Sequence, residues 1–287
     1  MITETELILT RKGRIYHLDL VPEEIPDTII TVGDPGRVKQ VSKYFDRVLF
    51  KRVHREFVSH IGELGSLKLM VISTGIGTDN IDIVLNEIDA LVNIDFNTRQ
   101  IKQEKRSLRI IRIGTSGTIR SDIEIDSLLI SKYAIGLDAL MGYYQKNIKT
   151  IPRLIIDQIN NSEYKLPENA YWGRADKSLL ELFSSPYFRQ GITITCPGFY
   201  GPQGRSLRMP STNFEVPVFQ KVKYEGLKIT NLEMETAAIY AMANSLGHKA
   251  ISLNAILANR MESKFSKNPS FIIEKLIKIA LDALIIK

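Results

Sequence analysis

The sequence predicts an α/β fold in which a mixed or parallel β-sheet is covered by helices on both faces. Several short runs of β-branched and apolar residues stop at glycine, as the buried strands of a central sheet do. Segments with apolar residues at helical spacing lie between these runs. With 287 residues and 44% hydrophobic content, the chain can bury a large core. No repeat or shift in composition interrupts it, so residues 1–287 are expected to form a single domain.

The expected elements alternate along the chain. The strands are expected at residues 27–36, 67–77, 108–117, 191–201, 227–235 and 249–260. The helices are expected at residues 79–95, 236–247 and 271–287. Asp79 can cap the first helix and Gly247 ends the second. Asn268 and Pro269 supply the cap and the first turn of the third.

Composition narrows the classes of function. The net charge is +6, but the basic residues are spread along the chain, so no nucleic-acid partner is expected. The single cysteine, Cys196, excludes an internal disulfide and fits a reducing compartment. The N-terminus lacks the pattern of a signal peptide, and charges interrupt the apolar helix at 271–287, so we expect a cytoplasmic protein without a membrane span. The basic segment 96–107 is expected to be a solvated loop or a helix extension.

Two glycine-rich strand ends predict an anion site. "VGDPGR" offers Gly33 for close approach of the backbone and Arg37 one helical turn later. "RIGTSG" places Arg112 before Thr115 and other small hydrogen-bond donors. Backbone N–H groups, hydroxyls and guanidinium groups together suit a tetrahedral oxyanion such as phosphate. Arg112 lies inside an apolar strand, where a charge needs a partner or a ligand.

A third loop, "FYGPQGR", suits a planar heterocycle. Phe199 and Tyr200 offer ring faces, Gln203 carries a donor and an acceptor, and Arg205 is a two-pronged donor. The alternative is an ordinary surface loop.

The segment "NLEMETAAIY" places Glu233 and Glu235 on either side of Met234, just before a helix. One interpretation is structural: acids near the start of a helix complement its dipole, and Asn231 is a plausible N-cap. The other is a pair of carboxylates that bind a ligand.

Several common motifs are missing. The sequence has no G-x-x-x-x-G-K-[ST], no complete G-x-G-x-x-G, no G-x-S-x-G and no H-E-x-x-H. Nucleotide hydrolysis, dinucleotide chemistry, a serine nucleophile and a metal site therefore lack support. We expect no metal and no cofactor.

Taken together, "VGDPGR", "HREF", "STGIG", "RIGTSG", "FYGPQGR", "EME" and "NR" resemble the uridine phosphorylases of the nucleoside phosphorylase family in order and spacing. The resemblance covers residues 17 to 260. It implies one α/β domain whose central mixed sheet curls toward a barrel. It also implies reversible phosphorolysis of a nucleoside, with phosphate as co-substrate, to free base and pentose 1-phosphate.

The resemblance also assigns roles to residues. The implied phosphate ligands are Gly33, Arg37, Arg112, Thr115 and, from a neighbouring subunit, Arg55. The implied nucleoside ligands are Phe199, Gln203, Arg205, Glu233, Met234, Glu235, Arg260 and, again from a neighbour, His17. The residues implied to act in the chemical step are Arg112, Gln203, Arg205 and Glu235. Active sites shared in this way imply a homodimer or a hexamer built of dimers.

The sequence departs from the family in three places. Thr78, Asp79 and Asn80 stand where Gly-Pro-Ser is usual, segment 96–107 is an insertion, and the resemblance is poor after Leu137. Tyr143, Tyr144 and Trp172 in the last of these are expected to be packing or lid aromatics. A monovalent cation near Glu56 is possible by resemblance only.

Alternatives to a pyrimidine nucleoside phosphorylase stay open. They are a purine nucleoside phosphorylase or a nucleosidase on the same fold, and a nucleoside-binding protein without activity. A purine-directed relative is expected to place an aspartate where this chain has Asn259, before Arg260, which favours pyrimidines. The sequence does not distinguish ribose from 2-deoxyribose.

Overall fold

The computed structural model describes residues 1–144, 149–211 and 214–285. Its strands are β1 (Thr28–Val32), β2 (Arg47–His54), β3 (Phe57–Leu64), β4 (Leu67–Ser73), β5 (Ile94–Asp95), β6 (Gln100–Ile101), β7 (Arg109–Thr118), β8 (Leu128–Gly136), β9 (Tyr171–Arg174), β10 (Phe188–Thr195), β11 (Lys223–Tyr224), β12 (Leu227–Glu233), β13 (Lys249–Asn259) and β14 (Lys264–Phe265). Its α-helices are α1 (Pro35–Ser42), α2 (Thr78–Asn93), α3 (Arg153–Asn160), α4 (Lys177–Leu182), α5 (Val216–Lys221), α6 (Thr236–Leu246) and α7 (Pro269–Ile285). Short 3₁₀ helices are η1 (Pro22–Glu24), η2 (Leu140–Tyr143) and η3 (Gly201–Gln203).

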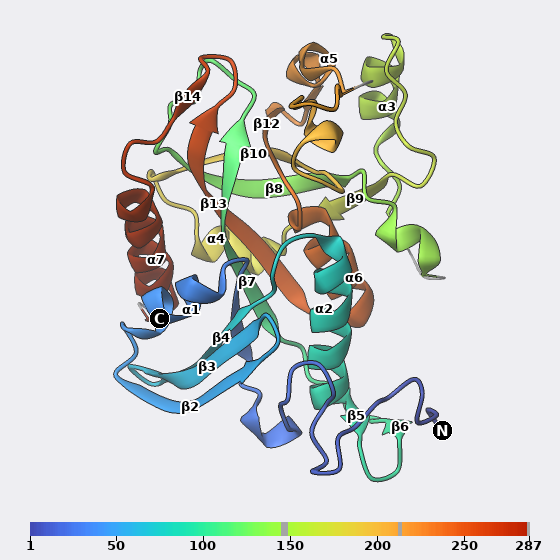
Figure 1. Cartoon of the computed structure of the whole chain (residues 1–287), viewed down its shortest axis with the longest axis vertical. Coiled ribbons are helices and arrows are strands. Elements are labelled where there is room, and N and C mark those ends of the chain that lie inside the picture. The colour runs from blue at the N-terminus through green and yellow to red at the C-terminus, as the bar shows by residue number, and fades with distance from the viewer. Residues whose placement is uncertain (145–148, 212–213, 286–287) are drawn as a thin grey trace.

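The main sheet is mixed and closes on itself. The neighbouring strands β12, β10, β8, β13 and β7 form a ring, because β12 also pairs with β7 through Asn231 and Leu232. From β7 the sheet continues through β1 and β4, which are parallel, to β3 and β2, which are antiparallel. Figure 1 shows this ring above the β2–β4 layer. The expected α/β fold with a mixed sheet curling toward a barrel is confirmed.

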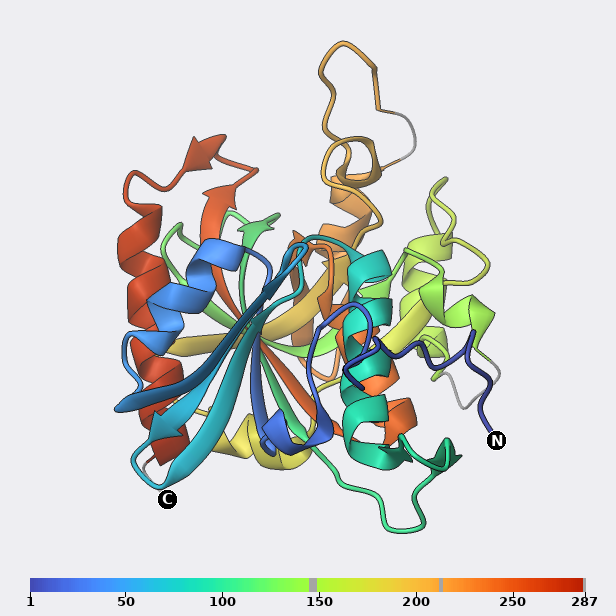
Figure 2. The ribbon, with the colours of Figure 1, turned by 60° about the horizontal axis from the view of Figure 1, so that its bottom comes forward.

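Helices cover the sheet on two sides. Figures 1 and 2 show α1 and α7 on one side of the strands and α2 and α6 on the other. The apolar residues that gave α2 its helical spacing, among them Ile81, Leu85 and Ile88, are fully or almost fully buried. In the described part of the chain no helix, α7 included, has the length and apolar character needed to cross a bilayer.

The predicted helix ends are right at two places and wrong at one. The backbone N–H of Phe271 donates to Oδ1 of Asn268 at 3.3 Å, and Gly247 ends α6 in the left-handed region at φ 84°. Asp79 does not cap α2. The N-cap is Gly77, at φ 95°, and Asp79 lies exposed in the first turn. The reason is a tertiary contact, since the N–H of Gly77 donates to Glu235 at 2.8 Å.

Segment 96–107 is neither a simple solvated loop nor a helix extension. Its first part belongs to the β5–β6 hairpin. Arg99 donates to the carbonyl groups of Thr3 and Leu7, and Arg106 donates to the carbonyl of Ile25. These two basic side chains therefore fasten the N-terminal segment to the body of the protein.

Candidate active site

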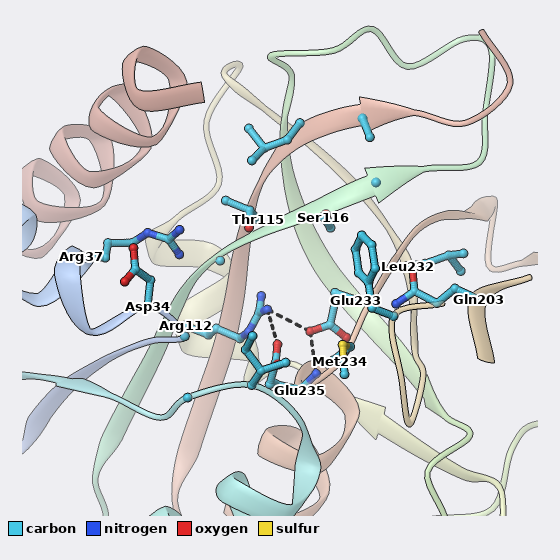
Figure 3. Close-up of a pocket in the computed structure, with 18 of the residues that line it drawn as sticks. Asp34, Arg37, Arg112, Thr115, Ser116, Gln203, Leu232, Glu233, Met234 and Glu235 are labelled. Atoms are coloured by element: carbon cyan, nitrogen blue, oxygen red, sulfur yellow. Dashed lines mark hydrogen bonds and ion pairs between the residues drawn. The ribbon is translucent and has the colours of Figure 1, made fainter. Parts of the chain in front are cut away.

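A cavity of about 730 Å³ opens where β1, β4, β7 and β12 end and where the β10–η3 loop returns (Figure 3). Most of the predicted site residues line it: Gly33, Arg37, Arg112, Thr115, Phe199, Gln203, Arg205, Glu233, Met234 and Glu235. His17, Arg55 and Arg260 do not line the cavity of this chain. The lining also includes residues outside the predicted set: Asp34, Pro35, Glu56, Gly75, Ile76, Asn80, Gly114, Ser116, Gly117, Leu232, Leu257, Ala258 and Phe265.

Arg112 projects from β7 to the centre of the cavity and joins two carboxylates. Its Nη2 lies 2.6 Å from Glu235 Oε2 and 3.1 Å from Glu233 Oε2 (Figure 3). Burial lowers the pKa of Arg112, but the two carboxylates outweigh burial and the pKa is raised. Arg112 is thus a fixed cation, because the two carboxylates keep it charged and hold it in place. The sequence expectation that it needs a partner is confirmed.

The strand makes room for this side chain with a glycine. A methyl group built on Gly114 would lie 1.9 Å from Arg112 Nη1, a distance that no real contact has. Nη1 itself donates to Asn254 Oδ1 at 3.0 Å. Gly114 therefore lets the guanidinium fold back over its own strand.

Glu233 is held almost wholly by the protein. Thr195 donates to its Oε1, and the backbone N–H groups of Glu235 and Thr236 donate to its Oε2 at 2.9 Å. The structural interpretation of the first acid is therefore right in kind, because Glu233 binds the N-terminus of α6. The expected cap is wrong. Asn231 lies buried inside β12, and α6 begins only at Thr236.

Glu235 keeps more free acceptor capacity. Its Oε1 accepts the N–H of Gly77 and its Oε2 accepts Arg112, so each oxygen retains a second acceptor position. Burial raises the pKa of Glu235, Arg112 opposes this, and the negative charge of Glu233 adds to it. Glu235 is thus the carboxylate of the pair that is able to bind a ligand.

Arg37 is a buried cation without a full set of partners. Its side chain is 9% exposed, its Nε has no hydrogen-bond partner, and Nη1 has only a long contact, 3.4 Å, with the carbonyl of Ile113. Burial lowers the pKa of Arg37, and nearby Asp34 opposes the shift. A buried guanidinium in this state favours an anion in the cavity.

The far end of the cavity brings together an aromatic ring, an amide and two guanidinium groups. Arg205 lies over the ring of Phe199, with 4.0 Å between Cζ and the ring centroid, and donates to Gln203 Oε1. Arg260 stands behind this pair and donates to the carbonyl of Gln203. In this chain Arg260 contacts the cavity wall through the backbone of Gln203, and its role near the base stays a prediction. Figure 3 shows Gln203 on the opposite side of the cavity from Arg37.

Comparison with known proteins agrees with this geometry. The model of the phosphorylase superfamily matches residues 27–282. The chain belongs to the phosphorylase superfamily. It is 30% identical to a uridine phosphorylase of Thermococcus kodakarensis, over 90% of this chain and 82% of the relative. It is 26% identical to a DeoD-type purine nucleoside phosphorylase of Streptococcus suis, over 94% and 98% of the two chains.

A solved member of the superfamily has the same fold. A nucleoside phosphorylase of Trypanosoma brucei that shows uridine phosphorylase activity superposes with a TM-score of 0.85 and is 29% identical. The alignment covers 97% of this chain and 99% of that one.

The two residues that the family resemblance assigns to a neighbouring subunit do not line the cavity of their own chain. His17 is bound by Glu87, which accepts from its Nδ1 at 2.6 Å and from its backbone N–H. Arg55 is exposed, has φ 55°, and lies over the ring of Tyr16 at 5.6 Å. Glu56, the next residue, lines the cavity.

The residues that depart from the family pattern differ in their relation to the cavity. Asp79 is exposed and is not among the lining residues, whereas Asn80 is. Trp172 stacks on Tyr133 at 4.9 Å and is a packing aromatic as expected. Tyr144 also packs, with its hydroxyl on Asp82 and Asn86.

The described residues give no support to metal chemistry or to a cysteine nucleophile. Within residues 1–144, 149–211 and 214–285, no group of three or more His, Cys, Asp or Glu side chains is placed to hold a metal ion. Cys196 is fully buried, and burial raises the pKa of its thiol.

Sequence reasoning missed the apolar wall of the cavity, made by Leu257, Ala258 and Phe265. The first two lie in β13, where the pattern is that of any buried strand. Phe265 comes from β14, which pairs back onto β13. No local motif marks these residues, because their shared position follows from the closing of the barrel.

Proposed function

We propose that the protein catalyses reversible phosphorolysis of a pyrimidine nucleoside, uridine in the first place, to the free base and a pentose 1-phosphate. The observation that carries this proposal is the division of one cavity into three parts. Under-partnered Arg37 and fixed Arg112 form an anion end, Glu235 lies at the centre, and Phe199 and Gln203 form a base end. The similarity to a uridine phosphorylase and to a nucleoside phosphorylase with uridine phosphorylase activity supports it.

The anion end supplies the attacking group. Phosphate takes the place that Arg37 leaves open, beside Gly33 and Thr115, and an oxygen of phosphate attacks the anomeric carbon. The new C–O bond forms as the glycosidic C–N bond breaks. Holding two reactants in one cavity converts a bimolecular step into an effectively unimolecular one.

The other parts stabilise charge that develops in the step. The sugar becomes cation-like as the C–N bond lengthens, so the carboxylate of Glu235 stabilises the transition state more than the ground state. The electron pair of that bond leaves with the base, and Gln203 and Arg205 take up the negative charge. Each charge-assisted hydrogen bond contributes about 1.5–3 kcal/mol. No covalent intermediate on the protein and no cofactor is needed.

Asn259 supports a pyrimidine over a purine. Its Nδ2 donates to the carbonyl groups of Arg120 and Ile123, and its Oδ1 accepts from the N–H groups of Met261 and Glu262. The side chain is 1% exposed. It is therefore a structural residue, and it offers no acid to protonate a purine.

Assembly is part of the proposal. The anion end of one subunit is completed by Arg55 of a neighbour, and the sugar pocket by His17 of a neighbour, in a homodimer or a hexamer of dimers. Exposed Arg55 beside cavity-lining Glu56 supports this arrangement. A cytoplasmic location stays a prediction from the single cysteine and the N-terminal sequence.

Product analysis tests the proposal. Purified protein is incubated with uridine, thymidine and inosine, each with and without phosphate, and the free bases are separated by chromatography. Uracil released only with phosphate is the expected result. Hypoxanthine as the main product would replace the pyrimidine assignment with a purine one. Base released without phosphate would mean a nucleosidase, and uridine binding without any release would mean a binding protein.

A further inference from the structure

A chain of buried polar side chains crosses the interior of the barrel. It starts at the fixed cation, ends at the cavity lining, and takes at least one residue from each strand of the ring. We call it the polar chain; its members are Arg112, Asn254, Ser131, Thr193, Asn231 and Ser116. Consecutive members are joined by hydrogen bonds of 3.0, 3.3, 2.5, 2.9 and 2.9 Å.

Arg112 sets the direction of the first links. A guanidinium has donors only, so the atom of Asn254 that faces it at 3.0 Å is the carbonyl oxygen Oδ1. The amide Nδ2 of Asn254 then faces Ser131 Oγ at 3.3 Å and donates to it. Thr193 has one proton and donates it to Asn231 Oδ1, which only accepts, so the hydrogen bond of 2.5 Å between Ser131 and Thr193 is donated by Ser131.

The direction continues to the cavity. Thr193 accepts from Ser131 and gives its own proton to Asn231 Oδ1 at 2.9 Å. Thr230 donates to the same oxygen at 2.8 Å, so two hydroxyl groups fix the amide of Asn231. Its Nδ2 donates to Ser116 Oγ at 2.9 Å. Because Ser116 accepts this bond, its proton is left for another acceptor.

Ser116 lies between the two ends of the cavity. It is half-buried and lines the cavity, and the next residue, Gly117, is near Arg205, since a methyl group built there would lie 3.7 Å from Nη2. Figure 3 shows Ser116 on the side of Thr115 that faces Leu232 and Gln203, away from Arg37. A donor in this place faces the nucleoside and not phosphate.

We infer that Ser116 donates a hydrogen bond to an acceptor oxygen of the nucleoside, and that Asn231 is the positioning residue that holds the Ser116 hydroxyl in the donor state. This inference rests on the proposed function for the class of ligand. It gives β12 a second task besides carrying Glu233, because the buried amide of Asn231 decides the polarity of the cavity wall. A purely structural Asn231 would stabilise the barrel without any effect on ligand affinity through Ser116.

Two substitutions separate these possibilities. Ser116→Ala removes the donor. Asn231→Asp keeps the shape but replaces the amide donor by a carboxylate, which draws the Ser116 proton inward and leaves a lone pair facing the nucleoside. Each change is expected to weaken uridine binding in calorimetry, about three- to tenfold for the loss of one neutral hydrogen bond. Phosphate affinity is expected to change less than twofold in Ser116→Ala.

The double variant provides the decisive readout. If Asn231 acts through Ser116, Asn231→Asp weakens uridine binding clearly less in the Ser116→Ala background than in the wild-type background. Any direct effect of the new charge is the same in both backgrounds and cancels in the comparison. Asn244→Asp, the same substitution on the exposed face of α6, is the matched control. Thermal unfolding of every variant shows that it is folded.

Several outcomes would overturn the inference. One is an equal cost of Asn231→Asp in the two backgrounds, and another is a Ser116→Ala variant that loses phosphate affinity but not uridine affinity. If Asn231→Asp does not fold, unchanged uridine affinity in Ser116→Ala alone overturns it. Failure of the proposed function is seen separately in product analysis of the wild-type protein, which then releases no uracil that depends on phosphate.

Discussion

Arg37 and Arg112 lie in the same cavity, but different groups hold them. Arg112 pairs with two carboxylates and also donates to Asn254, whereas Arg37 has an unpartnered Nε and one long contact. The first is a preorganised element of the site, and the second is a cation that needs its ligand. This difference predicts different consequences of removing each one.

Arg37→Met is expected to raise the KM for phosphate about ten- to hundredfold, the equivalent of one charge-assisted hydrogen bond. The free energy of unfolding without phosphate is expected to stay within about 1 kcal/mol of the wild-type value, because an apolar side chain replaces a poorly paired buried charge. Steady-state kinetics and urea unfolding measure the two quantities. A large loss of stability with unchanged phosphate KM would mean that Arg37 is structural.

Glu235 predicts a pH dependence of the reaction. The ionised carboxylate is the form that stabilises the cation-like sugar, and burial raises its pKa above the usual 4.5. Activity is therefore expected to fall as pH drops through this raised value. Glu235→Gln is expected to lower kcat about a hundredfold or more and to remove that acidic limb. If kcat/KM of the Glu235→Gln variant still falls at acidic pH, another group is responsible for this loss of activity.

The raised pKa of Glu235 also predicts that the free energy of unfolding depends on pH. Between 4.5 and the raised pKa, the folded protein holds a proton on Glu235 that the unfolded chain has lost, so stability falls as pH rises through this window. Glu235→Gln has no such titration. The free energy of unfolding of the variant, minus that of the wild type, is therefore expected to be larger at pH 8 than at pH 4. Urea unfolding at both pH values measures it.

Individual residues were predictable from sequence where a motif is local. Gly33 and Arg37 come from one turn, and Arg112 and Thr115 come from one strand end. Because the members of each pair are close in sequence, they reach the cavity together. The role of Glu233 was not predictable in the same way. Its bonds to Thr195 and to the start of α6 depend on where the helix begins, and that point lies five residues after the expected Asn231 cap.

At the scale of single elements, β7 positions the site because of its glycine. Gly114→Ala is expected to displace the Arg112 guanidinium and leave Glu233 and Glu235 without their cation, which costs about 3–5 kcal/mol of stability for a buried pair. Activity is expected to be lost with it. Thermal unfolding and kinetics measure both effects.

Gly117→Ala is the matched control for folding. It lies on the same strand, and its added methyl group would meet ordinary contacts, the nearest at 3.6 Å. Unfolding of Gly114→Ala at the wild-type temperature, with activity retained, would contradict the role given to Gly114.

Several strands with a strong apolar run were predicted well, but β3 and β8, which are also largely buried, were not predicted. The expected strands at 27–36 and 249–260 contain β1 and β13, and the one at 108–117 misses only the last residue of β7, because these strands are buried on both faces. The edge strand β2 is largely exposed, and its sequence "RVLFKRVH" carries no clear pattern of burial. The β5–β6 hairpin was missed because Arg99 and Arg106 look like solvated charges, although both are bound to backbone carbonyls.

At the scale of the whole molecule, closure of the barrel was expected only from the resemblance. The pairing of β12 with β7 joins Asn231 to Thr118 and Leu232 to Gly117, residues more than a hundred positions apart in the chain. Neither local propensity nor periodicity specifies such a contact. Yet this pairing brings Glu233 and Glu235 next to Arg112, so the site exists only in the closed molecule.

Assembly predicts that two inactive variants complement each other. Each active site takes Arg112 from its own subunit and Arg55 from the neighbour. In a mixed dimer of Arg55→Ala and Arg112→Ala subunits, one site therefore has both substitutions and the other site has neither. Because statistical mixing gives mixed dimers in half of the population, the co-expressed pair is expected to recover about one quarter of wild-type activity. Activity no higher than the mean of the separate variants would show that each subunit works alone.

The central claim is that phosphate, and not water, attacks the sugar in the cavity between Arg37 and Glu235. The most direct test is ³¹P NMR of the purified protein with uridine and inorganic phosphate. We expect a pentose 1-phosphate signal that grows in step with free uracil, and no turnover when phosphate is omitted. Uracil that appears without any sugar phosphate would contradict the account.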